Sequence, residues 1–440
     1  MSQFRLARLC LMLAAAGLSA APALMTSAHA QQKSAAPAAA PAAPQNTVRP
    51  DLFKLLDPAV VQPLMDAKNY AELQNRVTQA EAFPDKTPYE TYVVNRMKLS
   101  LGSVTGNDAL AIPALESVIE SGFLPPAETG NFILALGNMH YNAKNYPKAI
   151  EWFQRYQKES GTPEKVQAAL IRAYYLSEDY ASAKTALLPA IAAAEKSGQK
   201  PSNEDLRLLH SSAHQVKDDA TYLLALEKLA AYYPSDDYWA DVLNRGVMRK
   251  PGFDAQNNMV NVLRLHFAAA KTMAADEYVD LAEQALRDGF PTEAKKVMDA
   301  GYAAGVLGKG ANAKSHAALR DKANKGAADD AKNIASGEAA AAKSKKGAGL
   351  VNLGWAYVTM DQFDKGIGFI QQGIAKGGLK QPDEAKLRLG MAYARAGKKD
   401  EALKAFESVK AGGGLSDLAK YWTTLVNQQG GATATASAAQ

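Results

Sequence analysis

Apolar residues recur every three or four positions from about residue 51 onward, which is the spacing of one face of an α-helix. Alternating runs of β-branched residues, which would indicate strands, are missing from the sequence. Proline and glycine fall mostly between the periodic segments. Four prolines stand just before a helical run, where the first turn tolerates them: Pro88, Pro163, Pro201 and Pro382. The pattern predicts an all-α chain.

The stretch 131–153, NFILALGNMHYNAKNYPKAIEWF, shows how two of these helices would pair. Leu136 and Phe153 would point into the seam between two antiparallel helices. Gly137 and Ala149 are small where the helices would approach most closely, and His140 would be a hydrogen-bonded core residue. The pattern repeats after 34 residues, because Leu136, His140, Ala149 and Phe153 are followed at that interval by Leu170, Tyr174, Ala183 and Leu187.

Further helix pairs are predicted along the chain. A degenerate unit is expected at 203–234 and another at 275–305, and upstream pairs at 58–82 and 88–121. Two clear units follow near the C-terminus, and residues 415–426 would cover the open seam of the last one. The repeat residues of these two units are Leu353, Gly354 and Tyr357 in the first, and Leu389, Gly390, Tyr393, Ala402 and Phe406 in the second.

These motifs resemble the tetratricopeptide repeat, whose pattern is W-x2-L-G-x2-Y…A-x3-F…P with a period of 34 residues. The resemblance implies an α-solenoid of helix pairs wound into a right-handed superhelix. Segments 232–239, 288–310 and 351–367 also resemble exported repeat proteins of proteobacterial type. The first of them, YYPSDDYW, is similar to repeat proteins that accompany TonB-type energy transducers.

The N-terminus predicts a secretory signal peptide over residues 1–30. Arg5 and Arg8 precede an apolar stretch that ends in the cleavage pattern Ala28-His29-Ala30. An uncleaved membrane anchor is the alternative. Cleavage after Ala30 would place the chain in the periplasm and would remove Cys10, so the mature chain would have neither a disulfide nor a thiol nucleophile.

Composition divides the remaining chain. Residues 31–50 are rich in alanine and proline and predict a disordered tether, and residues 428–440 predict a disordered tail. An N-terminal helical array would cover 51–308, and a C-terminal repeat pair with its capping helix would cover 348–427. Between them, 309–347 is rich in alanine and lysine and would be a solvated helix or a flexible joint. We favour the helix, because both residue types are good helix formers.

Charge argues against nucleic acid as a partner. Removal of the signal peptide takes Arg5 and Arg8 from 50 basic residues, leaving 48 against 45 acidic ones, a net charge of +3. Lysine and arginine are scattered among the acids and form no stripe interleaved with aromatic residues. No later stretch reaches 18 uninterrupted apolar residues, so no membrane span is expected after the signal.

Motifs for catalysis are weak. Gly308–Ala313 fits G-x-G-x-x-G/A, but a helix-like segment precedes it where a dinucleotide site needs a strand. His210 and His214 are spaced i, i+4 without an acid within one turn. The acid pairs 218–219 and 236–237 fit a turn and the first turn of a helix. The sequence lacks G-x-S-x-G and H-E-x-x-H, and we expect no enzyme, cofactor or metal.

The resemblance places ligand contacts on the first helix of each pair, which lines the concave surface. Family members that hold a peptide's terminal carboxylate use lysine, asparagine and arginine there. Asn138 and Arg172 match in type, but the full clamp is absent. We therefore expect a groove for a protein or peptide of the cell envelope. The alternatives are a solvated scaffold surface, or a spacer in a trans-envelope machine for TonB-type energy transduction or envelope assembly. Oligomeric state is left open. The groove candidates are Asn138, Tyr141, Asn142, Arg172, Tyr175, Arg207, Ser211 and His214.

Overall fold

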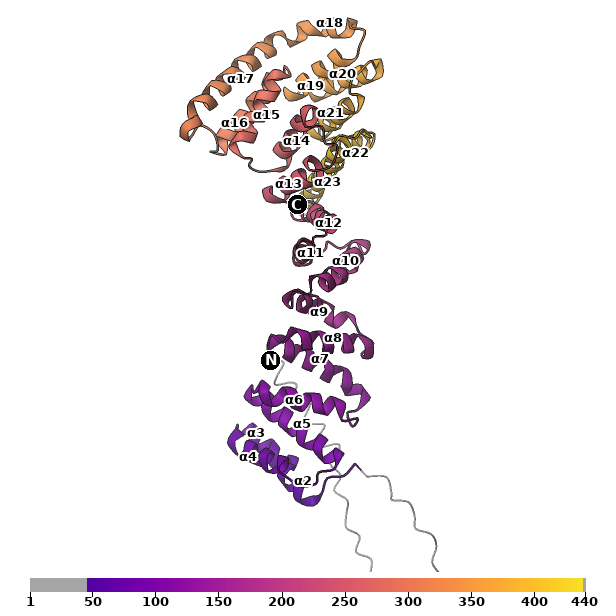
Figure 1. Ribbon diagram of the computed structural model, residues 1–440. Helices are drawn as coiled ribbons and strands as arrows, with labels where there is room; N and C mark the ends of the chain where they lie inside the picture. The colour runs from indigo at the N-terminus through magenta and orange to yellow at the C-terminus, as the bar shows by residue number, and fades with distance from the viewer. Residues whose placement is uncertain (1–45, 438–440) are drawn as a thin grey trace, which may run out of the picture. The chain divides into compact units, whose positions relative to one another are not determined.

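A computed structural model describes residues 46–437 (Figure 1). Within these residues the chain is helical from Pro50 onward and holds no strand. Backbone contacts divide it into two compact units, the first ending at Ala186 and the second beginning at Leu187. The boundary falls inside one helix, α10 (Tyr180–Lys196). The signal peptide and most of the tether predicted from sequence lie outside the described residues.

The first unit is a series of helices in which neighbours along the chain pack as pairs, α5 with α6 and α7 with α8. The pairs predicted at 58–82 and 88–121 correspond to α3–α4 and α5–α6. One apolar core runs through the unit from Val48 to Leu170. The helices are α2 (Pro50–Leu56), α3 (Pro58–Asp66), α4 (Tyr70–Glu81), α5 (Pro88–Thr105), α6 (Asp108–Glu120), α7 (Pro126–Asn142), α8 (Tyr146–Glu159), α9 (Glu164–Leu176) and the start of α10.

Small residues let α7 and α8 nest. A Cβ atom added to Gly137 would lie 2.7 Å from the Phe153 ring, which is closer than carbon atoms approach one another. Leu136, Ala149 and Phe153 are fully buried beside it. The side chain of Asn145 accepts a hydrogen bond from the backbone N–H of Lys148 and so caps the start of α8.

The segment before α2 is fixed to α5 rather than free. The Arg49 Nε and Nη2 atoms each lie 2.8 Å from an oxygen of the Glu90 carboxylate. Glu90 also accepts from the backbone N–H of Thr87 and completes the capping box of α5. Burial would raise the pKa of Glu90, but the hydrogen bonds and charge of Arg49 lower it to about 2. Residues 46–50 therefore differ from the disordered tether expected over 31–50.

The second unit has one continuous apolar core, which extends from Ala213 to Val426. The pairs predicted at 203–234 and 275–305 correspond to α11–α12 and α15–α16. The helices are α11 (Asn203–Gln215), α12 (Asp219–Tyr232), α13 (Asp236–Leu243), α14 (Ala255–Ala269), α15 (Ala275–Arg287), α16 (Pro291–Ala303), α17 (Ala313–Asn333), α18 (Glu338–Lys343), α19 (Ala348–Thr359), α20 (Phe363–Lys376), α21 (Pro382–Arg395), α22 (Lys399–Glu407) and α23 (Leu415–Ser437), with a π-helical turn at Asn244–Met248.

The alanine- and lysine-rich segment 309–347 is mostly helical, as favoured from its composition. Its long helix α17 runs along α15 and α16 (Figure 1). Ala323 and Ala327 are buried, and a Cβ atom at Gly326 would lie 2.6 Å from Pro291. Small residues allow this close packing without a large apolar face. The segment does not separate two arrays as expected, because the helices on either side of it share one core.

The capping helix α23 reaches further than the last repeat. It packs on α21 and α22, and also on α12 and α14 at the beginning of the same unit. The Tyr421 hydroxyl donates to Glu227 at 2.7 Å, and the Lys420 ammonium lies 2.6 Å from the same carboxylate. The helix continues to Ser437, so the structure differs from the disordered tail expected from residue 428.

Candidate functional site

The predicted groove residues of the first unit lie on α7 and α9. Asn138, Asn142 and Arg172 are exposed. Tyr141 packs edge-on against Tyr146 of the next helix, with ring centroids 5.6 Å apart. This tyrosine pair recurs one repeat later, where the rings of Tyr175 and Tyr180 lie 5.4 Å apart.

The aromatic contacts hold Tyr141 and Tyr175 in place, since edge-to-face pairs fix the ring direction. Leu176, next to Tyr175, leaves 45% of its surface exposed, which is unusual for a leucine in a repeat core. We use the name open face for Asn138, Tyr141, Asn142, Arg172, Tyr175 and Leu176. It combines amide groups, aromatic rings, a guanidinium group and an apolar side chain.

Beneath the open face the seam is closed. His140 is 6% exposed, and its Nε2 atom lies 3.3 Å from the Glu116 carboxylate of α6. This placement fits the core role expected for His140. The Tyr174 hydroxyl accepts a hydrogen bond from the Gln154 side chain at 2.7 Å and so ties α9 to α8. Both side chains join neighbouring helices.

The other groove candidates lie on α11, which belongs to the second unit. Arg207 and His214 are exposed, and Ser211 is half-buried. The His210 ring lies 4.1 Å from the Tyr222 ring. Burial lowers the pKa of His210, so the ring is neutral at pH 7.

The Tyr222 hydroxyl donates to Asp241 at 2.8 Å. Burial, and then the hydrogen bond to that carboxylate, raise the pKa of Tyr222 to about 12. The neighbourhood of His210 is therefore a packed junction of α11, α12 and α13. Among the described residues no three histidine, cysteine, aspartate or glutamate side chains are grouped as a metal site would require.

The equivalent face of the C-terminal repeats is covered. The spacing of Leu353-Gly354 and Leu136-Gly137 makes Trp355, Val358 and Thr359 the counterparts of Asn138, Tyr141 and Asn142. All three are at most 1% exposed. In the next repeat the counterpart of Asn138 is Met391, which is also fully buried. We call this surface the filled groove.

Helices α14 and α16 fill it. Glu293 of α16 is 4% exposed and accepts two hydrogen bonds from Arg264 of α14, at 3.0 and 2.8 Å. The indole N–H of Trp355 donates to the same carboxylate at 3.2 Å, and Arg395 of α21 lies 3.8 Å from it. The Arg264 guanidinium also lies 5.2 Å from the centre of the Trp355 ring. The network joins four helices around one buried carboxylate.

Electrostatics keep this network charged. Burial alone would raise the pKa of Glu293, but the charge and hydrogen bonds of Arg264, with Arg395 and Trp355, lower it. Burial lowers the pKa of Arg395, against the attraction of Glu293. A buried charge is tolerated only when it is paired in this way. The filled groove therefore offers no site for a peptide, because the chain's own helices occupy it.

Sequence reasoning missed the filled groove, although a signal was present. Trp355 and Met391 place large apolar side chains at the position that Asn138 holds in the first unit. In these repeats Gly354, Tyr357, Gly390, Ala402 and Phe406 are buried, whereas Leu353, Leu389 and Tyr393 are half-buried. A Cβ atom at Gly354 would lie 2.5 Å from the carbonyl oxygen of Gly366, so α19 and α20 nest closely.

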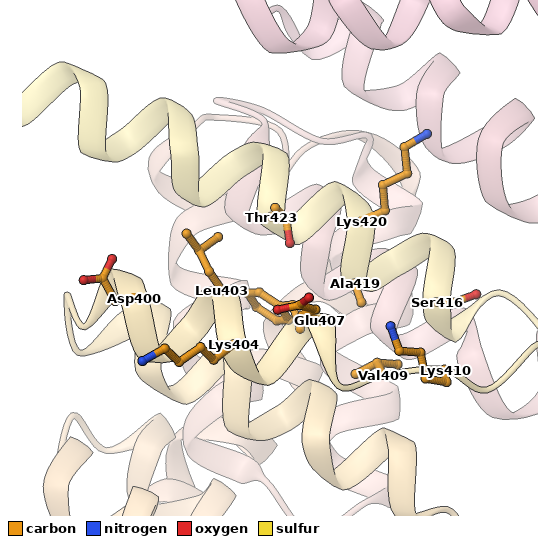
Figure 2. Close-up of a pocket in the computed structure, with 11 residues that line it drawn as sticks. Asp400, Leu403, Lys404, Glu407, Val409, Lys410, Ser416, Ala419, Lys420 and Thr423 are labelled. Carbon is orange, nitrogen blue, oxygen red and sulfur yellow. The ribbon is translucent and has the colours of Figure 1, made fainter.

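A third surface lies between α22 and α23, where a cavity of about 700 Å³ opens (Figure 2). Leu403, Phe406, Val409 and Ala419 give it an apolar part. Its edge carries both signs of charge, from residues such as Asp400, Glu407, Lys404 and Lys410, and Figure 2 shows the two lysines on opposite sides of it. Because acidic and basic residues both line this edge, it favours neither anionic nor cationic ligands.

Comparison with known families confirms the repeats in two segments. Residues 105–162 and 351–415 match the tetratricopeptide repeat. These matches show tetratricopeptide repeats in the two segments, which together make up less than half of the chain. The first match covers α6 to α8 and includes the α7 part of the open face. The second covers α19 to α22 and includes the filled groove, so one repeat family supplies both surfaces.

No curated protein matches the sequence. Solved structures similar to the chain include the TPR2AB domain of yeast Sti1 in a pHSP90 complex, at 13% identity over 69% of this chain and 100% of that one, with a TM-score of 0.22. A second is the P58(IPK) TPR domain, at 14% identity over 86% of this chain and 99% of that one, with a TM-score of 0.21. A third is yeast Tom70, at 11% identity over 86% of this chain and 96% of that one, with a TM-score of 0.18.

None of the helices in the described part of the chain is long and apolar enough to cross a membrane.

Proposed function

We propose that the chain is a non-catalytic interaction scaffold that holds a protein or peptide segment on the open face of α7 and α9. Tetratricopeptide repeats generally mediate protein–protein interactions. The observation that carries the proposal is the recurrence of exposed polar groups beside a fixed tyrosine, at Asn138 with Tyr141 and at Arg172 with Tyr175.

The chemistry of the open face suits an extended segment. Asparagine amides both donate and accept hydrogen bonds, so Asn138 and Asn142 can pair with the backbone of a bound peptide. Tyrosine and arginine are enriched at protein interfaces, where they bury a large area around a polar tip. Leu176 would add an apolar contact at the end of α9.

We further propose that the chain works in the periplasm after cleavage behind Ala30, in which case its partner belongs to the cell envelope. This rests on the basic, apolar and Ala-x-Ala parts of residues 1–30, which lie outside the described residues. Detection of the mature N-terminus at Gln31 in a periplasmic fraction would support it. Retention of residues 1–30 on the purified chain would contradict it.

The open face can be tested by photocrosslinking in cells. A photoreactive amino acid at Asn138 or Asn142 is expected to capture a partner, and the same group at Lys158, exposed on α8, is not. Arg172→Glu combined with Tyr175→Ala should reduce the crosslinks. Equal capture from Lys158, or capture unchanged by the double substitution, would reject this face as the binding surface.

No observation favours a spacer role for residues 309–347. Helix α17 packs on α15 and α16 through buried alanines, and Arg320 lies 2.6 Å from the Asp299 carboxylate of α16. Deleting the segment would uncover α16 and disturb the core. Loss of function after such a deletion would therefore report damage to the fold as well as a change in spacing.

A further inference from the structure

A separate cavity of about 350 Å³ lies beside the filled groove in the second unit. Helix α14, the turn before α19, the turn before α21 and the two helices α19 and α21 themselves surround it. Its size falls at the small end of ligand pockets in proteins. Its polar lining consists mainly of Asn257, Lys346, Asn352, Lys380, Glu384 and Arg388.

Arg388 is the fixed element of this cavity. It is 8% exposed, and it donates to Glu384 at 2.7 Å and to Asn352 at 3.0 Å. These bonds use two of the five N–H groups of the guanidinium. Its Nε atom is buried and has no hydrogen-bond partner among residues 46–437. The Glu384 carboxylate balances the positive charge of Arg388, whose remaining N–H groups can still donate hydrogen bonds.

Two lysines add charge that no carboxylate balances. Lys346 and Lys380 line the cavity and are exposed, and in the described part of the chain neither ammonium group forms an ion pair. Together with Arg388 they give three positive charges against the one of Glu384. Lysines 343, 345 and 376 extend the basic character of the surface around the two turns.

Carboxylates close to the cavity are already engaged. Asp383 accepts from Lys386 at 2.7 Å and from the backbone N–H groups of Lys410 and Ala411. Asp254 caps α14 and accepts from Asn257, and it lines the neighbouring cavity that also includes Lys380. Lys380 therefore has two acids, Asp254 and Asp383, in the neighbouring cavity. Lys346 shares its cavity with one acid, Glu384, whose carboxylate is paired with Arg388.

The two repeats place Asn352 and Arg388 at equivalent positions, 36 residues apart, as Gly354 and Gly390 are. The corresponding position of the first unit is Ala135. Asn352 and Arg388 stand one residue after Val351 and Leu387, which are buried in the core. The cavity thus differs in position and in residue type from the open face.

We propose that this cavity binds a small molecule bearing an oxyanion, a carboxylate or a phosphate. Arg388 would donate to the anion from a position held by Asn352 and Glu384, and Lys346 and Lys380 would close on it from the two turns. Charge-assisted hydrogen bonds of this kind are about twice as strong as neutral ones. Asn257 and Asn352 can bind the uncharged part. The proposal does not depend on the function of the open face.

Isothermal titration of the purified chain with inorganic phosphate and, separately, with succinate tests the proposal and distinguishes the two anions. At least one is expected to bind to saturation at one site. Lys346→Gln with Lys380→Gln should weaken that binding by about tenfold, which corresponds to about 1.4 kcal/mol. Both lysines are exposed, so the fold should persist, and an unchanged circular dichroism melt would confirm this.

The matched control removes the same charge elsewhere in the unit. Lys314→Gln with Lys325→Gln changes two exposed lysines of α17 that line none of the cavities described above, and it should alter the affinity less than about twofold. Equal weakening by both double substitutions would show diffuse attraction to a basic surface and overturn the proposal. Absence of saturable binding for both anions would overturn it as well.

Discussion

The pair α7–α8 and the pair α19–α20 share a seam and differ on the face beside it. Gly137 and Gly354 both allow the two helices of their pair to nest. In the position directly after each glycine, Asn138 is exposed and its counterpart Trp355 is fully buried. The comparison teaches that the seam fixes the repeat, whereas the residues between seam positions decide whether the groove stays open or receives a helix of the same chain.

The largest effect that separates the two faces should come from Trp355. Trp355→Ala would empty a fully buried site and remove the hydrogen bond to Glu293, at a cost of about 3–5 kcal/mol in the free energy of unfolding. Asn138→Ala, at the equivalent exposed position, should cost less than about 0.5 kcal/mol. Urea denaturation followed by circular dichroism measures both. Similar values for the two would contradict the distinction.

A second substitution tests the charge inside the filled groove. Glu293→Gln keeps the shape of the side chain and removes the charge that pairs with Arg264 and Arg395. It should lower the free energy of unfolding by about 3 kcal/mol, because breaking a buried ion pair strands the remaining charge. Glu151→Gln, at an exposed ion pair on α8, is the control and should cost less than about 1 kcal/mol. Equal losses of unfolding free energy for the two substitutions would indicate that the Glu293 carboxylate is exposed to water.

The shared seam predicts a smaller effect. Gly137→Leu would force a side chain against Phe153 and should cost about 1–3 kcal/mol by overpacking. The measurement is the midpoint of thermal or urea unfolding, with Gly337→Leu as the control because the space around Gly337 is open. An unchanged midpoint for Gly137→Leu would argue against the close approach of α7 and α8.

The smallest effect depends on pH and concerns the Arg49–Glu90 pair of the first unit. The pKa of Glu90 is about 2 in the folded chain, below the ordinary value of 4.5. A lowered pKa contributes stability above pH 4.5, and this is lost as pH falls toward 2. Arg49→Gln should therefore destabilise the chain at pH 6, and the difference from the unsubstituted chain should shrink between pH 4.5 and 2. A difference independent of pH would exclude the ion pair as its source.

The sequence predicted the contacts between residues that lie close together in the chain. Gly137, Ala149 and Phe153 could be interpreted from one stretch because the two helices of a pair are neighbours in the chain. The filled groove depends on contacts such as that of Trp355 with Glu293, which are 62 residues apart. A periodic pattern carries no information about such a partner. Only the apolar character of Trp355 and Met391 could have indicated that something covers them.

In the segment 309–347 the helix could be predicted from sequence, but its packing partners could not. Its composition correctly favoured a helix, because alanine and lysine have high helix propensity. Composition did not predict its position, since Ala323 and Ala327 look like surface residues until α15 and α16 lie against them. Close packing through small side chains is hard to distinguish in sequence from exposure to solvent.

The docking of α23 on α12 has a consequence for how the second unit can assemble and change. An open array can gain or lose a repeat at its end with little effect elsewhere, because each repeat touches only its neighbours. Here Tyr421 meets Glu227 across 194 residues, so the last helix completes the packing of the first ones. During synthesis the face of α12 that packs on α23 stays uncovered until the final helix emerges. A repeat duplicated between α12 and α23 would separate these two helices, so this unit cannot be lengthened as an open array can.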